Sequence, residues 1–283
     1  MKSSTLKALI DLLEDPDKEV YKTVKNELID QGTDIIPNLE DAWEKNFNSL
    51  TQDRVEEIIR EIQFNSLIAE LKSWIASPKN LLEGWLIISR YQYPELKIIS
   101  FEEELNKIAE EAKSSIKKYD SDLEKISTLN YILFNKYGFR GNMRNFHSPE
   151  NSFINDVIEN KKGNPLSLSI IYIYICQKIG LPICGVNMPK HFIVGFESDN
   201  HFDIDSIKFY INPFSRGTIL NRQDLEKFLK REKIKESSKY FSPCSNKEIL
   251  KRLINNLLHS YTYRSKKEKA EDMVTFLQLF KTK

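Results

Sequence analysis

Residues 163–196 decide the fold, and they read GNPLSLSIIYIYICQKIGLPICGVNMPKHFIVGF. Asn164 is typical of an N-cap and Pro165 of a first helical position, so a helix is expected to begin there. Residues 166–179 are apolar on nearly every side, which predicts a helix that is buried all round. Gly180 supplies a C-terminal stop. The stretch therefore predicts a central, buried helix.

Strand patterns follow this helix. Segments 183–188, 192–196 and 208–212 are rich in β-branched and aromatic residues and predict three strands. Helical periodicity returns at Asn221 and continues to the end of the chain. A buried helix packed on a small antiparallel sheet is an α+β arrangement. We therefore expect the α+β class, with helical regions on both sides of this core.

The first part of the chain is expected to be mostly helical. Residues 15–43, DPDKEVYKTVKNELIDQGTDIIPNLEDAW, resemble one HEAT-repeat unit, with an amphipathic helix, a glycine and a second helix. A solenoid normally stacks three or more such units, and no clean second copy is present. An irregular helical cap is the simpler interpretation. We expect three parts: a HEAT-like region 1–120, a core 121–235 and a helical tail 236–283.

Composition excludes several kinds of partner and site. The 283 residues carry 42 Lys and Arg against 41 Asp and Glu, so there is no overall attraction to nucleic acid or to an anionic membrane. Three cysteines without CxxC spacing argue against a disulfide framework or a zinc site. No signal-peptide pattern or 18-residue apolar run is present, which predicts a cytoplasmic protein without membrane spans. Scattered histidines and the absence of phosphate or dinucleotide motifs predict neither metal nor cofactor.

The core arrangement is the one that papain-type enzymes use for acyl transfer. Such enzymes place a nucleophile at the start of a buried helix, where the helix dipole stabilises a thiolate. A histidine on a neighbouring strand takes up the proton, and an Asp or Asn orients that histidine. Here the helix starts at Pro165, His191 stands at the head of a strand, and Asn212 ends the next strand.

Residues 134–220 resemble the transglutaminase-like superfamily and, within it, the bacterial SirB-type branch. The resemblance implies a papain-type core and extends weakly through residues 246–280, where that branch has a helical tail. It rests on the order and spacing of these motifs: ENSFINDVI with Asn151 and Ser152, KGNPLSLSIIY, Gly180-Leu181-Pro182, Gly185-Val186, Pro189-Lys190-His191-Phe192, and Asn212-Pro213-Phe214 with Gly217.

The resemblance also implies that the nucleophile is missing. Active superfamily members open the buried helix with Gly-x-Cys, about fifteen residues before the glycine of the Gly-Leu-Pro turn. That count, taken back from Gly180, reaches Pro165 in Gly163-Asn164-Pro165. Proline has no attacking atom, and it also lacks the backbone N–H that contributes to a papain-type oxyanion hole. The SirB-type branch shares this feature.

Two classes of function remain open. In the first, the chain is a non-catalytic protein that binds a peptide or protein through the degenerate cleft or through its helical arms. In the second, it is a hydrolase or acyltransferase with Ser167, His191 and Asn212 as an unusual triad, and with Asp203 or Asp205 as other partners for the histidine. Ser167 is also a common type of first-turn capping residue. The first class is favoured.

The three cysteines are expected to be unreactive. Cys176 belongs to the last turn of the buried helix, where the dipole disfavours a thiolate. Cys184 is expected in the middle of a strand, and Cys244 in a polar loop with no helix start to activate it. We expect none of them to replace the missing nucleophile.

Overall fold

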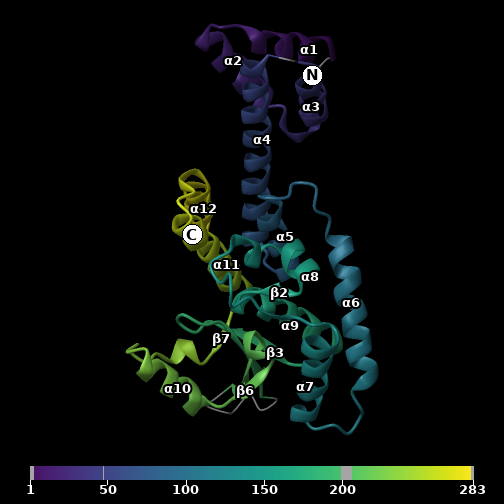
Figure 1. Ribbon diagram of the computed structural model, residues 1–283, viewed down its shortest axis with the longest axis vertical. Helices are drawn as coiled ribbons and strands as arrows, with labels where there is room; N and C mark the ends of the chain where they lie inside the picture. The colour runs from purple at the N-terminus through teal and green to yellow at the C-terminus, as the bar shows by residue number, and fades with distance from the viewer. Residues whose placement is uncertain (1–2, 47, 199–205, 282–283) are drawn as a thin grey trace. The chain divides into compact units, whose positions relative to one another are not determined.

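The computed structural model describes residues 3–46, 48–198 and 206–281, and it confirms the α+β class (Figure 1). Contacts divide the chain into two compact units, Met1–Ser73 and Trp74–Lys283. The smaller unit is helical, and the larger unit holds the sheet and the buried helix. The boundaries near residues 120 and 235 stay predictions.

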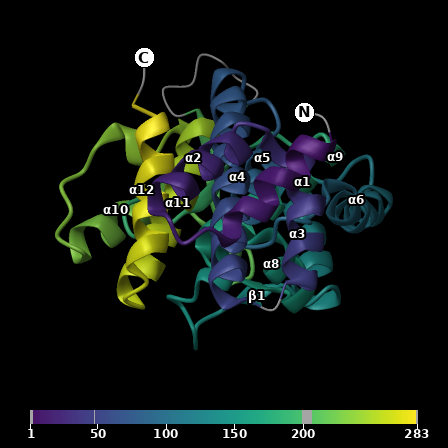
Figure 2. The same cartoon turned by 90° about the horizontal axis from the view of Figure 1, so that it is seen from above.

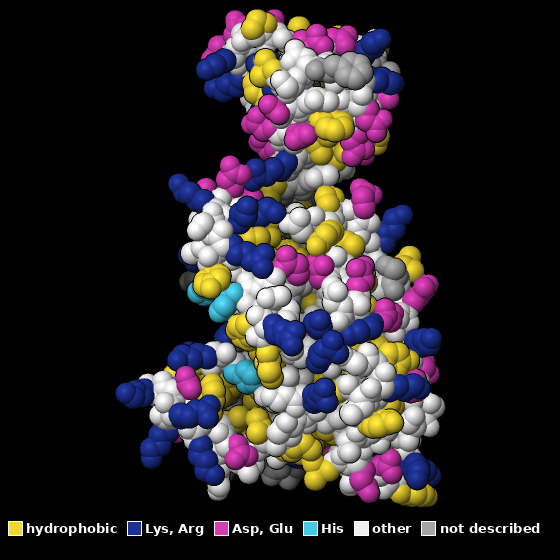
Figure 3. Space-filling view, in the orientation of Figure 1, with side chains coloured by type: hydrophobic (Ala, Val, Ile, Leu, Met, Phe, Trp, Pro, Cys, Tyr) yellow, Lys and Arg dark blue, Asp and Glu magenta, His cyan; other side chains and the backbone are white. Residues whose placement is uncertain are grey.

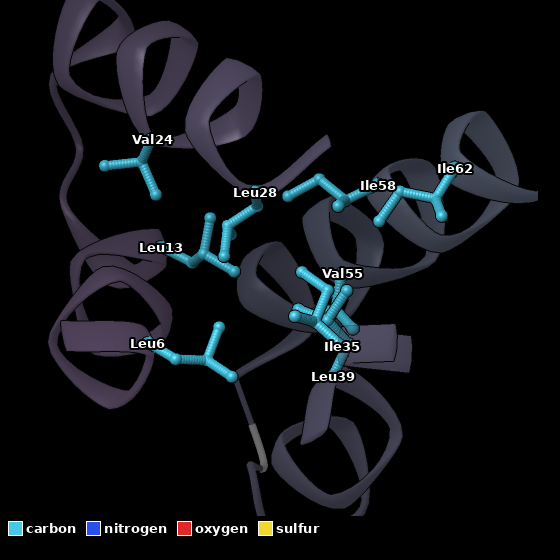
Figure 4. Packing of buried hydrophobic residues seen from close by; sticks show 9 residues of the cluster. All are labelled: Leu6, Leu13, Val24, Leu28, Ile35, Leu39, Val55, Ile58 and Ile62. Carbon is cyan, nitrogen blue, oxygen red and sulfur yellow. The ribbon is translucent and has the colours of Figure 1, made fainter. Parts of the chain in front are cut away.

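The smaller unit is built from amphipathic helices around one apolar core. Its helices are α1 (Ser3–Asp11), α2 (Lys18–Ile29), α3 (Ile36–Lys45) and α4 (Ser49–Ala76), the last continuing three residues into the next unit. The side chain of Asp17 caps α2 by accepting from the Glu19 N–H. The side chains of Figure 4 form the core: Leu6, Leu13, Val24, Leu28, Ile35, Leu39, Val55, Ile58 and Ile62.

A buried arginine connects the elements of this smaller unit. Arg54 on α4 donates from Nη1 to the carbonyl oxygens of Leu13, over 2.7 Å, and Asp15, over 2.6 Å. Its guanidinium also lies 4.3 Å from the centre of the Tyr21 ring. It thus satisfies two carbonyls in the turn between α1 and α2. The two helices expected within residues 15–43 are present as α2 and α3, and their likeness to a HEAT unit stays a prediction.

The larger unit contains a five-stranded antiparallel sheet in the order β6-β5-β4-β3-β7. The three strands expected from the sequence are present. The bounds are β3 (Ile183–Val186), β4 (Ile193–Glu197), β5 (Ile207–Asn212), β6 (Thr218–Leu220) and β7 (Pro243–Cys244). The edge strands β6 and β7 are too short for a periodic signal. The expectation of a polar loop at Cys244 is therefore wrong, because this residue pairs with Gly185.

Helix α9 (Pro165–Ile179) is the buried helix that the sequence predicts. Every residue from Pro165 to Cys176 is buried, and α9 packs against α6 (Ile98–Ser115) and strands β3 and β4. Its start is capped by Asn164, and its end is Gly180 in the left-handed conformation, with φ 77°. Both ends agree with the sequence, so the position of Pro165 in the fold is fixed by local signals.

Further helices complete the larger unit. They are α5 (Leu81–Arg90), α7 (Asp122–Asn130), α8 (Ile154–Asn160), α10 (Arg222–Arg231), α11 (Asn246–Tyr263) and α12 (Lys267–Leu279). Helices α11 and α12 lie side by side in both ribbon views (Figures 1 and 2). A short parallel pair, β1 (Arg140–Gly141) with β2 (Lys162–Gly163), precedes α9. In the part of the chain described, no helix combines the length and apolarity that a membrane span requires.

Asn151 stands before the helical pattern SFINDVIEN, and such a position predicts an N-cap. This prediction is wrong, because Asn151 lies in a 3₁₀ turn, Pro149–Ser152, and α8 begins only at Ile154. The Asn151 amide instead donates to the carbonyl oxygens of Asn145 and Phe146, over 2.7 and 3.1 Å. Its carbonyl oxygen accepts from the side chain of Asn142. The residue thus holds the loop that precedes α8 rather than a helix terminus.

Candidate functional site

A pocket of about 300 Å³ lies at the start of α9. Four parts of the larger unit contribute to it: the loop before α8, the first turn of α9, the approach to β4, and one side of α11. Its walls are formed by Phe146, His147, Asn164, Pro165, Leu166, Lys190, Phe192, Arg252, Asn256, His259 and Ser260. The position predicted for a nucleophile therefore borders a real cavity.

Pro165 lies in the wall of this pocket and offers no attacking atom. The next two backbone N–H groups, of Leu166 and Ser167, both donate to the Asn164 side-chain oxygen over 2.9 Å. These are the donors that a helix start would otherwise present to an anion. The first turn of α9 is thus closed by its own cap.

Ser167 is fully buried and is engaged with Asn164 in both directions. Its Oγ accepts from the Asn164 N–H over 3.0 Å and donates to the Asn164 carbonyl oxygen over 3.2 Å. The hydroxyl also fills the space beside Gly163, where a Cβ would lie 2.4 Å from Oγ. Ser167 does not line the pocket. This geometry is typical of a first-turn serine that closes its own helix.

The side chains of His191 and Asn212 lie close together. The His191 ring is also close to two aromatic rings, with centroids 6.4 Å from Phe214 and 6.3 Å from Phe228. Burial lowers the pKa of His191, and the charge of Arg252 lowers it further, whereas the polar side chain of Asn212 opposes both effects. The surroundings of the ring therefore favour its neutral form over the imidazolium.

The candidate triad is only partly assembled. Within residues 3–46, 48–198 and 206–281, no hydrogen bond joins the Ser167 hydroxyl to the His191 ring, although His191 and Asn212 lie close together. Asp203 and Asp205 fall outside the described residues. Asn212 also caps the turn that follows it, because its side chain accepts from the Ser215 N–H over 3.3 Å and donates to Ser215 Oγ over 3.1 Å.

None of the three cysteines is poised for chemistry. Burial raises the pKa of Cys176 well above that of a free thiol. Burial likewise raises the pKa of Cys184 and of Cys244 to about 12 each. A thiol with so high a pKa is almost entirely protonated at neutral pH and is a poor nucleophile. All three are free thiols.

Sequence reasoning missed the contribution of α11. Arg252, Asn256 and His259 come from a segment that reads as an ordinary amphipathic helix, and no motif marks them. Their spacing of four and three residues places them on one helix face, which is the only sequence signal available. No cluster of three or more His, Cys, Asp or Glu side chains suited to a metal ion occurs among the residues described.

Comparison with known proteins agrees with this geometry. The sequence profile described as "Transglutaminase-like superfamily" matches residues 99–255, which include the sheet, α9 and most of α11. The chain belongs to the transglutaminase-like superfamily. Its finer placement in the SirB-type branch stays a prediction.

The relatives in this comparison are bacterial and mammalian. The UPF0162 protein of Xylella fastidiosa (strain 9a5c) is 27% identical over 201 residues, covering 67% of this chain and 68% of that protein. The UPF0162 protein of Vibrio cholerae is 26% identical over 149 residues, covering 53% of each. F-box only protein 21 of Mus musculus is 23% identical over 233 residues, 72% of this chain but 36% of that protein. No solved structure matches.

Proposed function

We propose that this chain is a non-catalytic member of its superfamily, which uses the degenerate cleft at the start of α9 to bind a peptide segment of a partner protein. The observation that carries the proposal is Pro165. It stands in the wall of the pocket where the family pattern places a nucleophile, and the cavity around it persists. A cavity without an attacking atom is suited to binding rather than to acyl transfer.

The surroundings of the pocket support the same proposal. The walls of the pocket combine the neutral amide of Asn256 with the apolar side chains of Phe146 and Phe192. Amides recognise peptide backbone groups and aromatic rings receive side chains, so this mixture is typical of a peptide-binding cleft. One mammalian relative carries the name F-box only protein 21, which is compatible with a role in protein interaction. We expect the protein to act in the cytoplasm.

The triad of Ser167, His191 and Asn212 is the other candidate. It would require the Ser167 hydroxyl to be free for a base and exposed to substrate. Both hydrogen bonds of that hydroxyl are made with Asn164 at the first turn of α9. No observation favours this alternative, and we do not propose it.

A peptide selection tests the proposed function. Random peptides displayed on phage are selected on the purified full-length chain, and enriched peptides are measured by fluorescence anisotropy. Asn256→Trp places a bulky ring in the pocket wall, and the matched control Lys247→Trp alters an exposed position of the same helix that lines none of the described pockets. We expect enriched peptides that bind wild type and the control but not Asn256→Trp. No enrichment, or binding that is unaffected by Asn256→Trp, would contradict the proposal.

A further inference from the structure

The pocket at Pro165 adjoins a second and larger one. This second pocket has a volume of about 650 Å³, and it shares four wall residues with the first: Lys190, Arg252, Asn256 and His259. The two pockets are therefore neighbours that are separated by these shared residues. The remaining walls of the second pocket are Asn187, Glu248, Lys251 and Asn255. We call the two pockets together the α11 groove, because α11 contributes more of its residues than any other element.

The charge of the α11 groove is strongly one-sided. The described walls of the first pocket hold two permanent cations, Lys190 and Arg252, and no carboxylate. In the second pocket Glu248 is the one described acid, and its carboxylate accepts from Ser245 at the cap of α11, over 2.8 Å. Basic side chains also gather on the visible face of the larger unit (Figure 3). The groove therefore presents a net positive potential although the whole chain is almost neutral.

Arg252 is the cation best placed to bind an anion. It is partly buried, and both of its described hydrogen bonds leave Nη1 toward neutral acceptors, the Asn187 side-chain oxygen at 3.1 Å and the Met188 carbonyl at 3.4 Å. No carboxylate among the described residues pairs with it. Partial burial without a counter-ion lowers the pKa of Arg252. A desolvated guanidinium with unused donors binds a carboxylate more strongly than an exposed lysine does.

Lys190, unlike Arg252, is exposed and already paired with a carboxylate. Its Nζ forms a salt bridge with Glu232 over 3.0 Å, and its side chain is 63% exposed. An exposed pair of this kind contributes little to affinity. The start of α9 contributes no free donor either, because Asn164 caps the N–H groups of Leu166 and Ser167. Lys251, the third cation of the groove, is exposed to solvent, so recognition of an anion depends chiefly on the partly buried Arg252.

The other walls indicate what kind of anion fits. The same pocket is lined by Phe146, whose ring is 44% exposed and suits an apolar side chain. The Asn256 side chain, which makes no hydrogen bond to the described residues, is free to pair with a peptide backbone. A groove with one partly buried cation, amides and an apolar ring differs from a nucleic-acid channel, which needs a series of cations along the backbone.

We propose that the α11 groove binds an extended acidic peptide segment, with an Asp or Glu carboxylate of the ligand on Arg252 and an adjacent apolar side chain against Phe146. This inference rests on the proposed function, since it names the chemistry of the peptide that the cleft would take. It adds a partner class and a specificity-determining residue on α11.

Fluorescence anisotropy with matched probes tests the inference. The probes are fluorescein-labelled heptapeptides of equal apolar content that carry Phe-Glu, Phe-Gln or Phe-Lys at the centre, together with a labelled thymidine oligonucleotide. The proteins are full-length wild type, Arg252→Gln, Arg252→Lys and the control Lys247→Gln, which removes one exposed charge from the same helix. We expect the Phe-Glu peptide to bind about tenfold tighter than the Phe-Gln peptide, a typical gain from one charge-assisted pair.

The variants then separate the possible outcomes. Arg252→Gln is expected to abolish the tenfold preference, Arg252→Lys to keep part of it, and Lys247→Gln to leave it intact. Equal binding of the Phe-Glu and Phe-Gln peptides to wild type would overturn the inference, and this result does not depend on any variant folding. If selected neutral peptides still bind and Asn256→Trp blocks them, the proposed function survives without the inference. The inference would also be overturned if the oligonucleotide bound more tightly than the Phe-Glu peptide and this binding depended on Arg252.

Discussion

Ser167 and Asn164 satisfy each other at the first turn of α9: the Asn164 N–H donates to Ser167 Oγ over 3.0 Å, and the Asn164 side chain accepts from the Ser167 N–H over 2.9 Å. This reciprocal pair is a capping box in a buried setting. It holds Pro165 in the wall of the pocket, and it occupies the serine that an unusual triad would need. The same capping box therefore stabilises the start of α9 and keeps the Ser167 hydroxyl from acting as a nucleophile.

Removing the buried N-cap Asn164 is expected to lower the free energy of unfolding more than removing the exposed N-cap Asn221. Asn164→Ala removes the acceptor of two buried N–H groups and the bond from its amide to Ser152 Oγ. We expect the free energy of unfolding to fall by about 2 kcal/mol. Asn221→Ala, in the exposed capping box of α10, is the matched control and should cost about 1 kcal/mol. Urea denaturation measures both, and an equal or larger cost for Asn221→Ala would contradict the role given to Asn164.

Gly163 and Ser167 are expected to be energetically coupled. A Cβ at Gly163 would lie 2.4 Å from Ser167 Oγ, so Gly163→Ala should destabilise the fold by about 2 kcal/mol. When Ser167→Ala has removed the hydroxyl, the same change should cost about 1 kcal/mol less. Gly84→Ala, which meets Trp74 instead, serves as the control and should be additive with Ser167→Ala. Additive costs for the Gly163 and Ser167 pair in urea denaturation would refute the contact.

His191 is expected to lower the free energy of unfolding as the pH falls. Its pKa in the folded protein is below the value of about 6.5 expected for the unfolded chain. The unfolded chain therefore binds more protons as pH falls below about 6.5, and the free energy of unfolding falls until the folded ring titrates too. Each unit of difference in pKa corresponds to about 1.4 kcal/mol. We expect His191→Gln to reduce this loss of stability in urea denaturation at pH 7.5 and at pH 5.

The control for that experiment is His259→Gln, an exposed position on α11. This variant should keep the acid-dependent loss seen in wild type. An unchanged pH dependence in His191→Gln would mean that other groups cause the effect, and the environment assigned to the His191 ring would then be wrong.

Arg54 is expected to stabilise the smaller unit. Arg54→Met leaves the carbonyl oxygens of Leu13 and Asp15 without their donor, and we expect a loss of about 3 kcal/mol. Lys45→Met, which breaks an exposed pair with Asp41, should cost under about 0.5 kcal/mol. Hydrogen exchange of peptides from α1, α2 and α3 measures both effects. Similar exchange in the two variants would show that Arg54 does not stabilise this unit.

Local signals made much of the fold predictable. The helix from Pro165 to Gly180 could be read from the sequence because an asparagine cap, a proline and a glycine stop surround an apolar run. Edge strands β6 and β7 could not, since two or three residues carry no periodicity and their pairing depends on distant strands. Asn151 was misassigned because a polar residue before a helix can hold a loop as well as a helix start.

The candidate site was predictable only where a motif marks it. His191, Asn212 and Pro165 stand at positions that a known pattern defines, and the structure brings the side chains of the first two close together. Arg252 and Asn256 were missed because α11 begins 34 residues after Asn212 and approaches the pocket only through tertiary packing. Such long-range contributions to a site leave no local trace in the sequence.

Covalent labelling most directly tests the central claim that acyl chemistry has no nucleophile here. Folded wild type is incubated with a serine-directed fluorophosphonate and, separately, with a thiol-directed chloroacetamide, and each product is analysed by intact mass and peptide mapping. We expect no adduct on Ser167, and alkylation of the three cysteines only once the chain is unfolded. A stoichiometric adduct on Ser167 that disappears in His191→Ala would contradict the claim.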